Sequence, residues 1–102
     1  MTTITPPEDI APPSGAEADV WMQEGYRDIY SPIGVVITGD DFLRCPLITV
    51  VAKQFQDGHL EEIKVEIDDA GHQPLTAEQA REMAGFVTEA AGVAEQWAGV
   101  AL

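Results

Sequence analysis

The sequence predicts an α+β fold, a three- or four-stranded antiparallel β-meander with a C-terminal amphipathic helix packed on one face. Two observations carry this prediction. Two apolar-rich runs, residues 47–56 and 59–68, flank an Asp57-Gly58 dipeptide, which favours a β-hairpin turn. A helical apolar stripe then extends to residue 97 and can cover one face of a small sheet. The 102 residues suffice for one domain.

The N-terminal segment, residues 1–18, is predicted to form a Pro-rich acidic tail, and residues 19–102 a single small α+β domain. Four of the seven prolines lie within residues 1–13. Proline together with scattered carboxylates favours an extended chain over a packed core. The segment also lacks the basic start and the apolar core of a secretory signal, which agrees with a cytoplasmic protein.

Residues 19–38 are expected to supply the first part of the sheet. Residues 19–30 fit either a helical face or the start of a strand, and Pro32 would stop a helix there. The β-branched run 33–38 predicts a strand. The aromatic side chains of this region are expected to cover the core. They are Trp21, Tyr26 and Tyr30.

The hairpin register follows from the turn and from the alternation of apolar and charged residues. With Asp57-Gly58 as a two-residue turn, Gln56 faces His59. The apolar pairs on one face are then Ile48–Ile67, Val50–Val65 and Ala52–Ile63. The pairs on the opposite face are Phe55–Leu60, Lys53–Glu62, Val51–Lys64 and Thr49–Glu66. A one-residue slip would place charged side chains in the core, so the alternation disfavours it.

The helix is predicted to run from about Thr76, which forms a capping box with Gln79. Its apolar stripe faces the hairpin and consists of Met83, Phe86, Ala90, Val93 and Trp97. Gly85, Thr88 and Gly92 share another narrow face, although a glycine inside a helix costs about 1 kcal/mol relative to alanine. Two interpretations stay open, a surface that a second helix approaches closely or a tolerated cost in an Ala- and Gly-rich chain.

The charge of the chain excludes several classes of partner. It carries 18 Asp and Glu against 5 Lys and Arg, with a net charge of −13. Such a surface repels nucleic-acid phosphates and anionic membranes, so we expect neither direct nucleic-acid binding nor a membrane location. Acidity favours solubility and basic partners. The sharper alternative is an acidic mimic that occupies a nucleic-acid-binding protein.

No motif in the chain predicts catalysis, a metal site or a cofactor. The Walker A, G-x-S-x-G and H-E-x-x-H patterns do not occur. Cys45 has no adjacent base, although His59 or His72 could meet it in space. A solvated turn explains Asp68, Asp69 and His72 better than a metal site does. We therefore expect a non-enzymatic protein that holds no cofactor.

One helix cannot cover both faces of a sheet, which predicts a spare apolar surface near the hairpin tip. Such a surface must meet the N-terminal segment, a second copy or another protein. The predicted interaction surfaces, on the sheet and on the helix, comprise Val51, Phe55, Leu60, Gly85, Thr88 and Gly92. The predicted function is therefore protein binding. The alternatives are a self-associating structural module, such as a homodimer, and the acidic mimic.

Residues 57–97 also resemble a known group of proteins. The Asp-Gly turn, the charged alternating strand and the helix LTAEQAREMAGFVTEAAGVAEQW resemble small uncharacterised mycobacterial and mycobacteriophage proteins with LTxEQAR-type C-terminal helices. Thirteen alanines, no asparagine and two lysines agree with a GC-rich genome. The resemblance implies an α+β fold and a cytoplasmic, actinobacterial setting. For a phage-encoded chain, the expected partner is a host protein.

Overall fold

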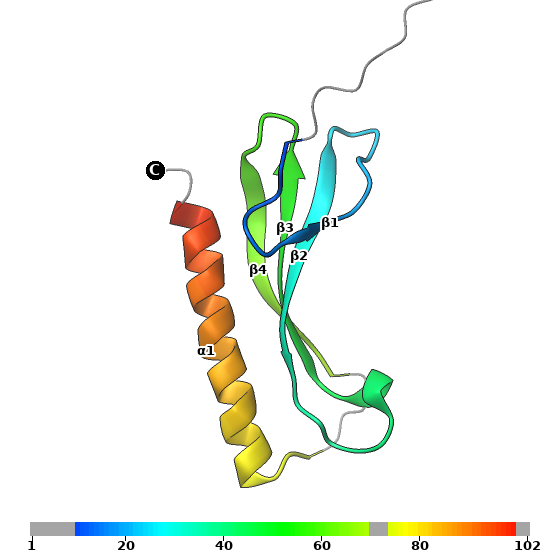
Figure 1. Cartoon of the computed structure of the whole chain (residues 1–102), viewed down its shortest axis with the longest axis vertical. Coiled ribbons are helices and arrows are strands. Elements are labelled where there is room, and N and C mark those ends of the chain that lie inside the picture. The colour runs from blue at the N-terminus through cyan, green and yellow to red at the C-terminus, as the bar shows by residue number, and fades with distance from the viewer. Residues whose placement is uncertain (1–9, 70–73, 100–102) are drawn as a thin grey trace, which may run out of the picture.

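The computed structural model describes residues 10–69 and 74–99. Its elements are β1 (Glu17–Ala18), β2 (Tyr26–Val35), a 3₁₀ turn η1 (Phe42–Arg44), β3 (Leu47–Phe55), β4 (Leu60–Asp68) and α1 (Ala77–Gly99). The strands form one antiparallel four-stranded sheet in the order β1-β2-β3-β4. The helix α1 packs along one face of this sheet (Figure 1). The predicted fold class is confirmed.

The hairpin of β3 and β4 keeps the predicted register in the half that lies away from its turn. The pairs from Ile48–Ile67 to Val51–Lys64 stand as the alternation predicts. Nearer the turn, the prediction is wrong by one residue. Lys53 pairs with Glu61 instead of Glu62, and the partner of Leu60 is Gln54 instead of Phe55.

Two irregularities that compensate each other cause this local shift. The N–H of Phe55 donates to the carbonyl of His59 at 3.0 Å, which leaves residues 56–58 in the loop. Within this loop Gly58 alone has a positive φ, of 95°, as in a three-residue hairpin loop that ends on a left-handed glycine. Glu62, with φ of 54°, then lies in a bulge that restores the predicted register.

The strand β2 begins within residues 19–30, for which the sequence predicts either a helix or a strand. It runs from Tyr26 to Val35 and passes through Pro32. Its ladder with β3 is irregular between Pro32 and Gly34, which suits a residue that has no N–H to donate. The first three residues of the predicted strand 33–38 are therefore the end of β2, and residues 36–38 lie outside the strand.

Residues 10–18 lie against the sheet, although the sequence assigns them to the tail. Arg27 is buried and donates from Nε to Oε1 of Gln54 at 2.9 Å. The carbonyls of residues 10 and 11 accept from Arg27 and from Gln54 respectively. A buried guanidinium requires such partners, so this network fastens the segment to the domain, and β1 extends the sheet. Residues 1–9 of the predicted tail lie outside the described residues.

The core lies between α1 and the sheet. The capping box is confirmed, since Thr76 N–H donates to Oε1 of Gln79 at 2.9 Å and Gln79 N–H donates to Oγ1 of Thr76 at 3.1 Å. The predicted apolar stripe of α1 packs against this core. The buried apolar cluster comprises Ile29, Val36, Ile48, Val50, Ala52, Ala90 and Trp97. Phe86 approaches Gly34 so closely that a Cβ there would overlap its ring.

Candidate functional site

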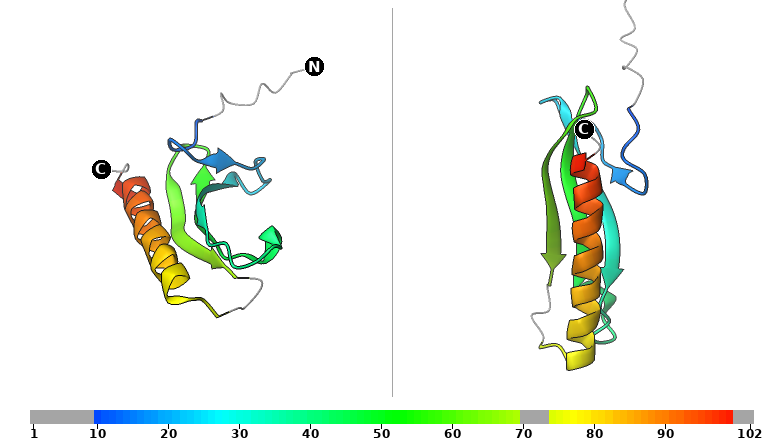
Figure 2. Two further views of the ribbon diagram at one scale, coloured as in Figure 1. Left: turned by 60° about the horizontal axis from the view of Figure 1, so that its bottom comes forward. Right: turned by 90° about the vertical axis from the view of Figure 1, so that its left-hand side faces the viewer.

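The sheet has two faces of unlike character, and α1 covers only one of them (Figure 2). We name as the covered face the side that bears Ile29, Ile48, Val50 and Ala52. Side chains alternate along a strand, and paired residues of neighbouring strands point to the same side. The opposite side, the open face, therefore carries Tyr26, Asp28, Tyr30, Thr49, Val51, Lys53, Phe55, Lys64 and Glu66.

A shallow hollow of about 500 Å³ lies on the open face. Tyr30 and Val51 contribute apolar and aromatic surface to it. Its charged lining residues are Asp28, Lys53, Glu62, Lys64 and Glu66. Val51 is half-buried here, on the side where the alternation places it. The hollow combines an apolar floor with charges of both signs, which suits recognition of a protein surface.

Leu60 does not belong to the open face, and its predicted place beside Val51 and Phe55 is wrong. It pairs with Gln54, which alternates in phase with the buried Ala52, and it packs against the core. The cause is the three-residue loop. A shift of one position in the ladder turns a side chain to the other face of the sheet.

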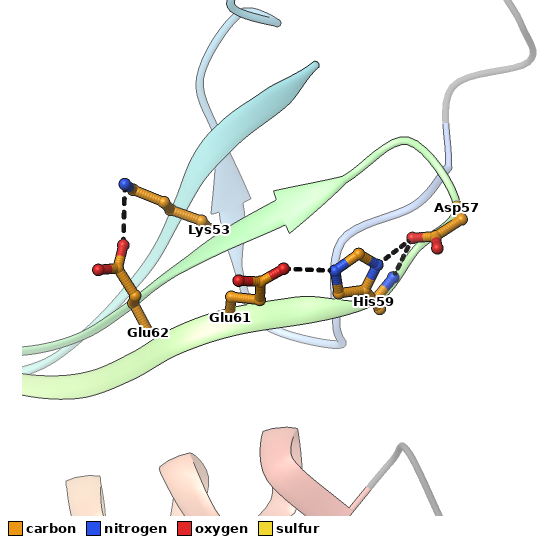
Figure 3. Close-up of polar contacts among 5 residues, drawn as sticks. All are labelled: Lys53, Asp57, His59, Glu61 and Glu62. Atoms are coloured by element: carbon orange, nitrogen blue, oxygen red, sulfur yellow. Dashed lines mark hydrogen bonds and ion pairs between the residues drawn. The ribbon is translucent and has the colours of Figure 1, made fainter. Parts of the chain in front are cut away.

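At the turn end of the open face, His59 lies between two carboxylates (Figure 3). Its Nε2 is 2.7 Å from Oε2 of Glu61, and its Nδ1 contacts Asp57, whose Oδ1 also accepts the backbone N–H of His59 at 3.0 Å. The bonds with Glu61 and with Asp57 raise the pKa of His59. The backbone N–H of His59 lowers the pKa of Asp57. With both ring nitrogens bonded to carboxylates, the imidazolium form is favoured and offers no lone pair to a substrate.

The aromatic rings of Tyr26 and Phe55 lie between His59 and Lys53 on the open face. The Nζ of Lys53 is 2.8 Å from Glu62, an ion pair that raises the pKa of Lys53 and lowers that of Glu62. The same nitrogen lies 4.7 Å from the ring centroid of Tyr26. Tyr26 and Phe55 have centroids 5.9 Å apart, and Phe55 stacks on His59 at 4.6 Å. These contacts hold the tip of the open face in one arrangement.

Tyr26 and Tyr30 belong to the open face. The prediction that they cover the core is therefore wrong. In β2 the two tyrosines alternate with Arg27 and Ile29, which are buried and point to the covered face. This alternation could have placed both tyrosines, had the sequence identified the region as a strand. The third aromatic residue, Trp21, lies under the guanidinium of Arg27 at 4.5 Å.

The predicted glycine-bearing surface lies on the side of α1 that faces away from the sheet. Gly85, Thr88 and Gly92 are exposed, and a Cβ at either glycine would meet nothing within 4 Å. The hydroxyl of Thr88 donates to the carbonyl of Ala84 at 2.9 Å. The structure thus brings these three residues together, but separates them from Val51 and Phe55 by the whole thickness of the domain.

Cys45 lies at the end of the sheet opposite to His59. It is 5% exposed, and its Sγ accepts the N–H of Thr38 at 3.5 Å, which lowers the pKa of the thiol. Cys45 precedes β3 and His59 follows it, so this strand separates the two by roughly 25 Å. Cys45 and His59 therefore do not meet, and His72 lies outside the described residues. Within residues 10–69 and 74–99, no group of three or more metal-ligating side chains is placed to hold an ion.

Comparison of the chain with protein-family models, with curated proteins and with solved structures found no match. None of the helices in the described part of the chain has the length and apolar character that crossing a membrane requires. The function is therefore inferred from the geometry of the open face.

Proposed function

We propose that this chain is a small non-enzymatic protein-binding module that docks a partner on the open face of its sheet. The observation that carries the proposal is the one-sided packing of α1. The helix and residues 10–18 meet the covered face, whereas Val51, Phe55 and the hollow around them stay accessible. An accessible apolar surface with a polar rim is typical of protein interaction sites.

The charges around the hollow indicate the chemistry of the partner. Asp28, Glu66 and Lys64 line the hollow and make no ion pair within the described residues, which leaves two carboxylates against one ammonium group. Lys53 is already neutralised by Glu62. With a net charge of −13 over the whole chain, the field attracts a basic surface. The partner that fits is a protein that presents an apolar side chain flanked by lysine or arginine.

The geometry of the reactive side chains supports binding over catalysis. General base catalysis needs an accessible lone pair within hydrogen-bond reach of a nucleophile or substrate. Both ring nitrogens of His59 are occupied by carboxylates. The thiol of Cys45 is buried at the other end of β3.

The proposal is tested by capture with matched surface variants. The resemblance of residues 57–97 makes a mycobacterial lysate the natural source of partners. We expect the wild-type chain to retain a basic protein in stoichiometric amount, and Val51→Arg to lose it. Ala91→Arg adds the same charge on the exposed side of α1 and should retain the protein as the wild type does.

Two results contradict the proposal. One is that no protein is retained, and the other is that Val51→Arg retains as much as Ala91→Arg. A salt gradient separates the acidic mimic from apolar docking. Binding through charge alone weakens steeply as the salt concentration rises, whereas binding through Val51 and its hollow persists.

A further inference from the structure

The strand β4 forms one edge of the sheet, and its outer side faces no other strand within the described residues. The right-hand view of Figure 2 shows α1 in front of the face of the sheet, with β4 at one side of the helix. The strand is nine residues long. An edge of this length presents a row of N–H and C=O groups that can pair with another strand.

The residues that direct these groups outward can be identified from the hairpin. Phe55 directs its N–H toward β4, where it bonds with His59. Val51, four residues away, does the same by alternation, and its partner Lys64 directs its own groups inward. The residues that direct their N–H and C=O outward are therefore Ile63, Val65 and Ile67. The bulge at Glu62 lies outside this stretch, so the edge from 63 to 68 is regular.

This stretch is complementary to itself. When a second copy runs antiparallel with Val65 opposite Val65, Ile63 lies opposite Ile67, and Lys64 lies opposite Glu66. By symmetry each of the last two pairs occurs twice. Opposite charges in facing positions of an antiparallel pair are stabilising. Ile67, which is 49% exposed in the single chain, gains an apolar neighbour on the covered side.

The neighbouring registers are less favourable. Centring the pair on Lys64 places lysine against lysine and Glu62 against Glu66, and centring it on Glu66 places glutamate against glutamate. Like charges in facing positions are destabilising. Centring on Ile63 puts the bulged Glu62, with φ of 54°, inside the new ladder. The Val65-centred register sets Glu62 against Asp68 only at its ends, where Glu62 is held by Lys53.

We propose that two copies of this chain associate through β4 in the Val65-centred antiparallel register, which makes one continuous sheet with a helix of each copy on the same side. Within each chain, Lys64 faces Val51 and Glu66 faces Thr49. Neither charge therefore has an ion-pair partner across β3, and both are available to the second copy. The Lys64–Glu66 pairs form at the β4 edge of the open face, whereas Val51 and Phe55 make no contact in this dimer, so the proposal does not rest on the proposed function.

Charge reversal at the edge tests this register. We expect sedimentation equilibrium to give a mass of twice 11.0 kDa for the wild type. Lys64→Glu and Glu66→Lys each create two facing like-charge pairs and should weaken the dimer by at least about tenfold. The double variant Lys64→Glu/Glu66→Lys restores opposite charges and should restore the dimer. Glu89→Lys, on the exposed side of α1, changes the net charge as Glu66→Lys does and is the control for that variant.

Three results overturn the proposal. The first is a monomeric wild type at about 1 mM chain, a concentration that detects even millimolar association. The second is a dimer that persists unchanged in both single variants, and the third is a double variant that stays monomeric while its circular dichroism spectrum matches the wild type. None of these results concerns Val51→Arg, so failure here is distinct from failure of docking on the open face.

Discussion

The covered face and the open face belong to the same strands, yet their side chains have opposite surroundings. Ile48 and Val50 on the covered face have no exposed surface. On the open face the side chains of Lys53 and Glu62 are 38% and 54% exposed. Burial of one aliphatic side chain stabilises by about 1.5–3 kcal/mol, whereas water screens the charges of an exposed ion pair, so that the pair contributes far less. The covered face therefore supports the fold, and substitutions on the open face should cost little stability.

The largest expected effect comes from removing the large side chain that α1 buries in the core. Trp97 is 4% exposed, so Trp97→Ala should lower the free energy of unfolding by about 3–5 kcal/mol. Urea unfolding followed by circular dichroism measures this loss. Its neighbour Gln96 is exposed, and Gln96→Ala should stay within about 0.5 kcal/mol of the wild type. Similar losses in the two variants would contradict the packing of α1 on the covered face.

A pair of glycines distinguishes the packed side of the molecule from its exposed side. At Gly34 a new Cβ would overlap the ring of Phe86, so Gly34→Ala should destabilise by about 1–3 kcal/mol. At Gly92 a new Cβ meets open space, so Gly92→Ala should stabilise by up to about 1 kcal/mol. Thermal unfolding of both variants gives the signs. A stabilised Gly34→Ala variant would show that α1 does not approach β2 this closely.

A pair of threonines tests how α1 begins. Thr76→Ala removes the acceptor that holds the N–H of Gln79 and should cost about 0.5–2 kcal/mol. Thr88→Ala removes a hydroxyl that bonds only within the helix, to Ala84, and should be neutral or slightly stabilising. Chemical unfolding of the two variants compares them directly. A Thr76→Ala variant that loses no more stability than Thr88→Ala would contradict a stabilising capping box.

The smallest expected effect is a pH dependence at the tip of the open face. The pKa of His59 is raised by Glu61 and Asp57. The stability that His59 contributes is therefore fully present below its unfolded-state pKa, about 6.5, and is lost as the pH rises through the higher folded-state pKa. An NMR titration assigned with His59→Gln should show the raised pKa. A His59 that titrates at or below its ordinary pKa would contradict the contacts drawn in Figure 3.

Periodicity predicted those parts of the structure in which many residues repeat one pattern. The stripe of α1 and the pairs from Ile48–Ile67 to Val51–Lys64 are of this kind, because each residue independently indicates the same face. The predicted register at the tip of the hairpin was wrong because an Asp-Gly pair occurs in two-residue and in three-residue loops alike. The three-residue loop shifts the pairing by one position, and Leu60 therefore lies on the covered face.

The attachment of residues 10–18 depends on contacts between distant parts of the chain. Arg27 and Gln54 are 27 positions apart, and Gln54 reaches the carbonyl of Ala11 across 43 positions. No pattern among neighbouring residues of the sequence predicts such a network. The tyrosines of the open face were missed for a related reason, since residues 19–30 fit two kinds of element until β3 supplies the partner strand.

The most direct test of the division between the two faces uses adjacent valines of β3. Val50 is fully buried on the covered face, and Val51 lines the hollow of the open face. We expect Val50→Ala to lower the free energy of unfolding by about 2 kcal/mol and Val51→Ala to lower it by less than about 1 kcal/mol. Urea unfolding of the two variants under one set of conditions decides the matter. Equal losses, or a larger loss at Val51, would contradict the account.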